Sequence, residues 1–116
     1  MSKRGDPAPR PAKSSEWRIT LATSDAASGW DELARHAPGP LATLYDHLTV
    51  DPRRIENPER QGRLKGTLAT VNVKGQALPQ WQYEITGGGR VWYAPDDRKN
   101  IVWIVAASTG HPKQTD

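Results

Sequence analysis

The sequence predicts an α+β domain in which a helical hairpin is packed on one face of a small antiparallel β-sheet. Two observations predict this class. Residues 16–50 have the pattern of a strand followed by two amphipathic helices, and residues 81–107 have the pattern of three short strands separated by turns. Helices and strands that are segregated along a chain are typical of helices gathered on one side of an antiparallel sheet.

The strands of residues 81–107 are predicted from alternation and from turn residues. Large apolar residues alternate with polar ones from Trp81 to Thr86, which is the period of a half-buried strand. Three glycines at 87–89 and the segment Pro95–Asn100 supply the two turns. The run Ile101–Ala107 is apolar on both faces, as expected of the central strand of a small sheet. The segment is therefore expected to form a three-stranded meander. The side chains expected to face the helices are Trp81, Tyr83 and Ile85.

The first helix is expected to follow a first strand at Glu16–Thr23, where apolar and polar residues alternate. Ser24 is a suitable N-cap, and Asp25 then lies in the first turn, where a helix favours negative charge. The apolar residues recur at helical spacing and give the helix one buried face. They are Ala26, Trp30, Leu33 and Ala37.

Pro40 is well placed in the first turn of a second helix, which Pro52 ends. Because few residues join the two helices, they should form an antiparallel hairpin. His36 and His47 lie in these helical segments, where we expect them to be partly buried and without a chemical role. The predicted buried face of the second helix is Leu41, Leu44, Tyr45 and Leu48.

The connection from the helices to the meander has no long apolar pattern. Asp51–Gly66 is rich in charge and offers little to bury, so it is expected to be a loop. Thr67–Val73 has the composition of a strand, and Lys74–Pro79 is expected to be a turn. With no further helix in the pattern, the second face of the sheet is expected to be open.

The 116 residues are expected to form one domain, residues 16–116, preceded by a disordered basic arm, residues 1–15. After the initiator, the arm has no aliphatic residue larger than alanine. The arm holds four of the sixteen basic residues and one of the thirteen acidic residues. The domain therefore has twelve basic and twelve acidic residues and is neutral. A basic arm can hold an anionic partner such as nucleic acid. The alternative is a solubilising tail or an extension without function.

Several functional classes are excluded by composition. The chain has no cysteine, which removes disulfides, thiol catalysis and thiolate metal sites. No stretch approaches the roughly 18 apolar residues of a membrane span, and the arm lacks the apolar segment of a secretory signal. We therefore expect a soluble cytoplasmic protein that makes no membrane contact. The three histidines have no metal-ligand spacing, so we expect neither a metal nor another cofactor.

The candidate site lies on the sheet face turned away from the helices. By alternation, Gln82 and Glu84 should point to that face, and Arg90 begins the next strand directly after the glycine turn. His111 and Lys113 follow the last strand. A carboxylate or imidazole can take a proton, and arginine can stabilise charge on a phosphate, so this set suits phosphodiester cleavage. Trp92 would share the Arg90 face and offer a stacking surface for a base.

Each of these residues also has a purely structural interpretation. Glu84 can be an ordinary outward strand residue, and His111 can be an ordinary residue of the chain's tail. Trp92 can pack against a neighbouring strand or a partner instead of a base. The site hypothesis therefore depends on the strand register bringing these side chains together.

The order of these segments resembles the RelE/ParE superfamily of bacterial type II toxins. The resemblance is carried by Leu64-Lys65-Gly66, then GGGRVWYAPDD, then IVWIVAASTGHPK, and it covers about Trp17 to Lys113. It implies the RelE-like microbial ribonuclease-type fold. It also implies a toxin that a cognate antitoxin neutralises, most often an mRNA endonuclease acting with the ribosome. DNA would be contacted only through the antitoxin complex.

By position, Arg90 matches the arginine that this superfamily places at the start of the second strand of the meander. His111 and Lys113 fall where ribonuclease members have a basic or imidazole residue. Gln82 and Glu84 occupy positions that are lysines in some members, although others use a glutamate with a histidine. The tyrosine or helix found at the C-terminus of several members has no counterpart in the segment HPKQTD.

Three hypotheses follow. In the first, a metal-independent endoribonuclease, Glu84 or His111 is the base, Arg90 with Lys65 stabilises the charged phosphate, and His111 or Lys113 assists the leaving group. In the second, the same fold acts without catalysis on gyrase, as in the ParE branch. The third is an interaction domain that recruits a peptide at its open face or edge. The residues expected to bind RNA in the first hypothesis are Arg63, Lys65, Trp92 and Gln82.

Overall fold

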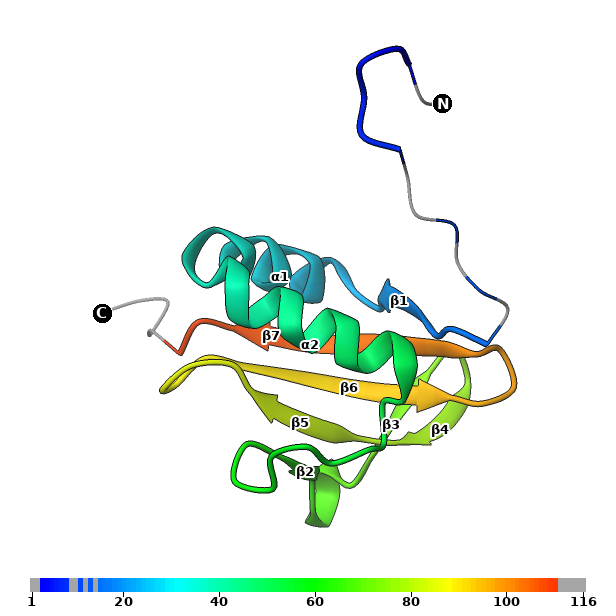
Figure 1. Cartoon of the computed structure of the whole chain (residues 1–116). Coiled ribbons are helices and arrows are strands. Elements are labelled where there is room, and N and C mark those ends of the chain that lie inside the picture. Colours follow the sequence, from blue (N-terminus) through cyan, green and yellow to red (C-terminus); the bar gives the residue numbers. More distant parts are fainter. Residues whose placement is uncertain (1–2, 9–10, 12, 14, 111–116) are drawn as a thin grey trace.

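A computed structural model describes residues 3–8, 11, 13 and 15–110 and confirms the predicted α+β class. Two helices cover one face of a five-stranded sheet of order β1-β7-β6-β5-β2, and β3 and β4 form a separate two-stranded sheet (Figure 1). The β1–β7 pair is parallel and the other pairs are antiparallel. The strands are β1 Arg18–Leu21, β2 Gln61–Arg63, β3 Thr70–Val73, β4 Gln76–Pro79, β5 Trp81–Glu84, β6 Arg90–Asp96 and β7 Ile101–Ser108.

Helix α1, Ser24–His36, begins one residue earlier than predicted, at the residue expected to cap it. The N-cap is Thr23 rather than Ser24, because the Thr23 hydroxyl accepts the Ala26 N–H at 3.0 Å while Ser24 already has helical geometry. The helix buries Ala26, Gly29 and Leu33. Gly29 lies so close to β7 that a Cβ atom there would collide with the Ala107 carbonyl oxygen.

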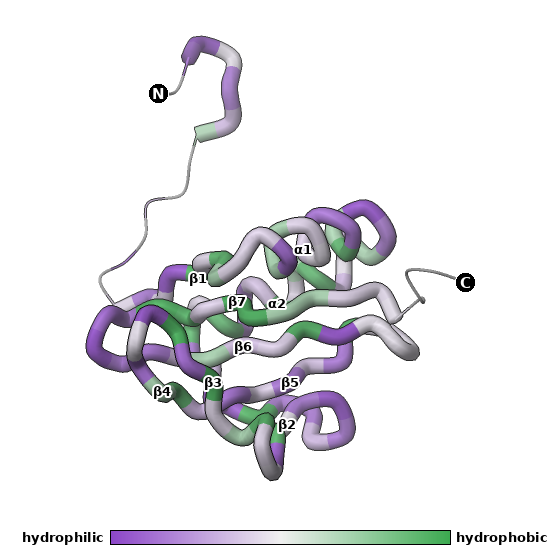
Figure 2. Tube along the Cα trace, turned by 180° about the vertical axis from the view of Figure 1, so that it is seen from behind, coloured by the Kyte–Doolittle hydropathy of each residue, from purple (hydrophilic) through white to green (hydrophobic). Residues whose placement is uncertain are grey.

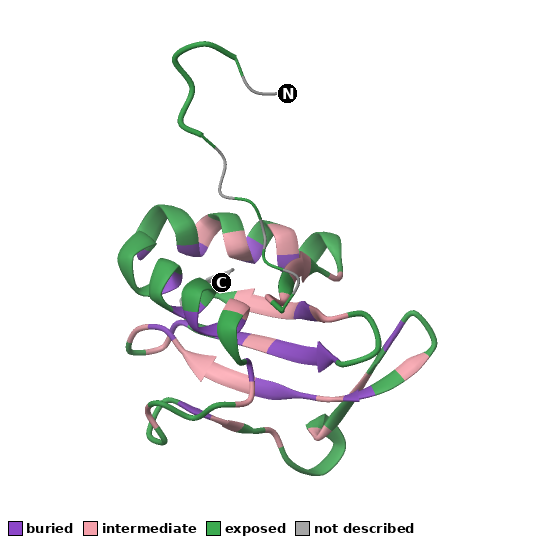
Figure 3. Ribbon diagram, turned by 45° about the vertical axis from the view of Figure 1, so that its right-hand side comes forward, coloured by how far each residue is buried: buried purple, intermediate pink, exposed green. Residues whose placement is uncertain are grey.

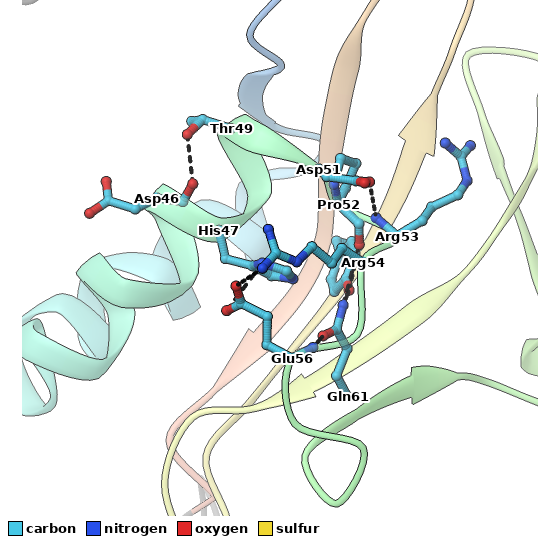
Figure 4. A network of polar contacts seen from close by, with 10 residues as sticks. Asp46, His47, Thr49, Asp51, Pro52, Arg53, Arg54, Glu56 and Gln61 are labelled. Carbon is cyan, nitrogen blue, oxygen red and sulfur yellow. Dashed lines mark hydrogen bonds and ion pairs between the residues drawn. The ribbon is translucent and has the colours of Figure 1, made fainter.

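Helix α2, Pro38–Val50, buries three of the four residues predicted for its inner face. Tyr45 is the exception. It is 45% exposed, and His47 takes the fourth inner position. The burial expected for His47 is therefore confirmed, whereas His36 is exposed and the burial expected for it was wrong. His47 Nδ1 lies 3.5 Å from Glu56 Oε1 (Figure 4).

The meander β5–β6–β7 forms as predicted, except that its last strand is not the central strand of the sheet. Trp81, Ile85 and the partly buried Tyr83 pack with the helices in the main core. The central strand of the sheet is β6, and β7 lies between β6 and β1. A bulge leaves Val105 without a β6 partner, because Trp92 pairs with Ala106 and the next residue pairs with Ile104. Apolar residues of β7 reach both faces of the sheet, as its composition indicated.

The predicted turn Lys74–Pro79 is wrong, because most of it is strand β4. The turn is only Lys74 and Gly75, whose positive φ angles of 51° and 83° suit a tight hairpin. Val73 and Leu78 of the hairpin pack on Ala94 and Trp103, on the sheet face away from the helices. That face, which we call the outer face, is therefore covered toward the β6–β7 turn and open toward the β5–β6 turn (Figure 2).

The charged connection after α2 is more ordered than predicted. It contains the short strand β2, and its Gln61 is buried. Gln61 Nε2 donates to the Tyr93 hydroxyl at 2.8 Å, and that hydroxyl donates to the Pro52 carbonyl at 3.1 Å. Burial raises the pKa of Tyr93 well above its ordinary value. The connection is thus tied to the core by these hydrogen bonds and by the buried Pro52 (Figure 4).

Buried residues concentrate where the helices face the sheet (Figure 3). The described residues of the arm extend away from the domain (Figure 1). No helix in the described part of the chain is both long and apolar enough to cross a bilayer.

Candidate functional site

Strand register assembles two rows of residues across the outer face. β5 pairs Glu84 with Arg90, and β7 pairs Ser108 with Arg90. On the other side, the Glu84 N–H donates to the Arg60 carbonyl at 2.8 Å, so Arg60 continues the same row one residue before β2. The first row is Arg60, Glu84, Arg90 and Ser108. The second row is Gly62, Gln82, Trp92 and Ala106.

Glu84 and Arg90 are the charged centre of the first row. Directly opposed residues of an antiparallel pair have Cβ atoms about 4.5–5.5 Å apart, so the two side chains rise next to each other. Arg90 is exposed and Glu84 half-buried, and no ion pair joins the two in the described structure. A carboxylate and a guanidinium that are adjacent but not paired to each other can each contact a bound substrate.

Trp92 is held in place within the second row. Its indole Nε1 donates to Gln82 Oε1 at 2.7 Å. Next to it, Arg90, Trp92, Ala106, Ala107 and Ser108 line a shallow apolar depression of about 190 Å³. A fixed indole beside an apolar depression suits the stacking of one flat ring.

The end of the described chain returns to this site. Gly110 has a φ of 90°, and a Cβ atom there would overlap the backbone of Gly88 in the β5–β6 turn. The backbone after β7 therefore crosses the turn that precedes Arg90. His111 and Lys113 lie outside the described residues.

The structure does not bring Arg63 and Lys65 to the two rows. Arg63 pairs with Trp81, which belongs to the core under the helices, and its guanidinium carbon lies 5.9 Å from the Trp81 ring centroid. It also donates to the Ala69 carbonyl at 3.2 Å. Lys65 is exposed and follows β2, whereas Arg90 is level with the residue that precedes β2. Lys65 and Arg90 are thus at opposite ends of this part of the sheet.

Arg60 was missed by sequence reasoning. Its Nη1 donates to the carbonyls of Glu84 and Ile85, at 3.3 and 3.2 Å, so its guanidinium lies at the carboxyl end of β5. The sequence shows Arg60 only as one basic residue in a charged connection. The turn residues Asn57 and Pro58 just before it, where the Arg60 N–H donates to the Asn57 carbonyl, are a local signal that a strand begins there.

No group of three His, Cys, Asp or Glu side chains within the described residues is arranged to hold a metal ion. The chemistry available to this face from the described residues is that of Glu84 and the arginines: proton transfer and stabilisation of negative charge.

Comparison with solved structures identifies the fold. The isolated RelE toxin of E. coli superposes with a TM-score of 0.57 at 16% identity, over 84% of this chain and 88% of that one. RelE in the archaeal RelE–RelB complex from Pyrococcus horikoshii superposes with a TM-score of 0.56 at 15% identity, over 80% and 93%.

The chain has the RelE-type fold. The YoeB dimer of Staphylococcus aureus is similar as well, with a TM-score of 0.59 at 13% identity over 83% of this chain and 99% of that one. No model of a known protein family matches the sequence, and no curated protein matches it. The RelE-type fold is therefore recognised from the structure, in agreement with the resemblance noted in the sequence.

Proposed function

We propose that this protein is the toxin of a type II toxin–antitoxin system and inhibits growth by cleaving mRNA on the ribosome, in the cytoplasm, without a metal. The observation that carries the proposal is the adjacent Glu84 and Arg90, which form no ion pair with each other, on the open part of the outer face beside the fixed Trp92. The RelE-type fold supports it, because the similar structures are toxins. That the Pyrococcus RelE was solved with RelB supports an antitoxin as partner.

The proposed reaction uses the RNA as its own nucleophile. Glu84 or His111 takes the proton of a 2′-hydroxyl, whose oxygen bonds to the adjacent phosphorus. Arg90 stabilises the charge that develops on the phosphate oxygens. The bond from phosphorus to the 5′-oxygen breaks, and His111 or Lys113 protonates that oxygen. The products are a 2′,3′-cyclic phosphate and a 5′-hydroxyl.

The RNA-binding residues divide into two groups in this proposal. Trp92 stacks on a base, and Gln82 fixes the indole that does so. Arg63 and Lys65 contact the RNA farther from the scissile phosphate, because Lys65 lies at the far end of β2 from Arg90. This replaces the expectation that Lys65 acts together with Arg90 on one phosphate.

The test is cleavage of mRNA on programmed ribosomes by the purified full-length protein. We expect Glu84→Gln and Arg90→Ala each to lower the single-turnover rate by ~10²–10⁴-fold, the range typical of acid–base and electrostatic groups. Arg98→Ala is the matched control, since Arg98 is an exposed arginine of the β6–β7 turn, at the other end of the sheet. Unchanged rates in both site variants would refute the assignment of these residues.

A non-enzymatic toxin directed at gyrase is the second candidate. The neutral domain favours it, since nucleic-acid binding usually draws on an excess of basic charge. It predicts inhibition of DNA supercoiling by gyrase while mRNA stays intact. Cleaved mRNA with normal supercoiling would reject it.

A further inference from the structure

A second depression lies on the other side of β5 from the apolar one. It has a volume of about 200 Å³ and is mainly polar. Gln82 of the second row borders it, so it opens next to the proposed RNA-binding surface. The lining residues are Pro58, Glu59, Arg60, Gln61, Gly62, Arg63, Leu64 and Gln82. Its charged lining consists of two guanidinium groups and one carboxylate, which leaves it net positive.

Arg60 is the lining residue that is both charged and aligned with the first row. Its guanidinium is anchored through Nη1 on the carbonyls of Glu84 and Ile85, while the side chain as a whole is exposed. An anchored guanidinium loses little conformational freedom when it binds an anion, and its planar set of N–H donors suits phosphate. Arg63 is less available, because it is stacked over Trp81 and bonded to the Ala69 carbonyl.

The distance between the two arginines of the first row suits two neighbouring phosphate groups of one ligand. Arg60 and Arg90 flank Glu84 on either side, and adjacent strands lie about 4.7–4.9 Å apart, so their backbones are roughly 10 Å apart. Glu84 thus lies between two segments that each carry an arginine in the same row. A single nucleic acid strand laid along this row would meet positive charge on both sides of the carboxylate.

We propose that the polar depression is a second phosphate subsite, in which Arg60 binds a backbone phosphate next to the one that faces Glu84 and Arg90. The inference rests on the proposed function. It adds the path of the substrate: a single RNA strand crosses β5 from the apolar depression at Trp92 to the polar depression at Arg60. It also gives the outer face positive charge where Gln82 and Glu84 supply none.

The test is equilibrium binding of a short single-stranded RNA whose 2′-hydroxyls are all methylated, so that it binds without being cleaved. Arg60→Gln removes the charge but keeps a polar side chain with N–H donors. We expect it to weaken binding about tenfold at low salt, as for the loss of a charged hydrogen bond. The slope of log K against log salt should fall in magnitude by about 0.7, the value for one phosphate contact with a single strand.

Two further variants separate charge from structure. Arg60→Lys keeps the charge, so its salt slope should equal that of the wild type. Arg98→Gln removes an exposed arginine far from the depression and should change neither quantity. An unchanged salt slope in Arg60→Gln would overturn the subsite. A salt slope in Arg60→Lys as low as that in Arg60→Gln would also overturn it.

These measurements also separate a failure of the subsite from a failure of the proposed function. If the wild-type protein cleaves mRNA and Arg60→Gln binds RNA with an unchanged slope, only the subsite fails. If the wild-type protein neither binds the methylated RNA nor cleaves mRNA, both proposals fail together.

Discussion

Tyr93 carries a hydroxyl into the interior between the helices and the sheet. Its side chain is fully buried, and the hydroxyl has two partners, Gln61 Nε2 and the Pro52 carbonyl. Both partners belong to the connection between α2 and β5. One residue of the central strand thus holds a segment that has few apolar side chains of its own.

Tyr93→Phe is expected to lower the free energy of unfolding by about 1–2 kcal/mol, since it removes two hydrogen bonds from a buried site without creating a large cavity. Gln61 and Pro52 retain their mutual bond of 3.3 Å, which limits the loss. The measurement is urea denaturation at neutral pH. Tyr83→Phe is the matched control, because no hydrogen bond of the Tyr83 hydroxyl is found in the described structure, and it should change stability by less than about 0.5 kcal/mol.

The same residue makes stability depend on pH in the alkaline range. Burial raises the pKa of Tyr93 in the folded protein, so above pH ~10 the unfolded chain loses the phenol proton while the folded chain keeps it. The unfolded state then binds fewer protons, and the free energy of unfolding falls as pH rises. In Tyr93→Phe this part of the decrease should be absent. Equal alkaline slopes for the two proteins would contradict the assignment.

At the scale of elements, α1 and β7 approach each other closely. Gly29 lets the helix backbone approach the Ala107 carbonyl, where no Cβ atom fits. Gly29→Ala improves helix propensity by about 1 kcal/mol. It nevertheless should destabilise the protein by about 1–3 kcal/mol, because the helix must move away from the sheet. The control is Ser28→Ala, at the adjacent exposed position, which should stabilise the protein slightly. If Gly29→Ala proved more stable than the wild type in thermal unfolding, the contact between α1 and β7 would be loose.

The elements that could be predicted from the sequence are those with a long apolar pattern. Both helices and the meander β5–β7 satisfy this condition, and their buried faces were largely as expected. Strands β2 and β4 were missed because each has only three or four residues and bonds through its backbone. Tyr45 is exposed although its spacing predicted burial, and the neighbouring inner position is filled by His47, whose ring centroid lies 6.3 Å from that of Tyr83.

The candidate site shows the same limit. Glu84 and Arg90 could be placed together from alternation and one turn, because they are neighbours across a single hairpin. Arg60 could not, since its place depends on the pairing of the post-helix connection with β5, twenty-four residues further along the chain. The face on which Arg63 lies could not be predicted either, since its register follows from the pairing of β2 with β5.

At the scale of the whole molecule, charge is distributed unevenly between the domain and the arm. The domain is neutral, and the net charge of +3 comes from residues 1–15. In the described part of the arm, the hydrogen bonds stay within the arm or reach only Glu16. Removing most of the arm should therefore change electrostatics without changing the fold.

Deletion of residues 1–12 is expected to leave the midpoint of thermal unfolding unchanged, because the core lies entirely within the domain. It removes three basic residues, Lys3, Arg4 and Arg10, but keeps Lys13, whose N–H donates to Glu16 Oε1. If the arm binds RNA, the salt slope for the methylated RNA should fall in magnitude by up to about 2, since each phosphate contact contributes about 0.7. Combined with Arg60→Gln, the two decreases should add, because the arm and the polar depression would hold different phosphates. An unchanged slope after the deletion would mean that the arm makes no contact with RNA phosphates.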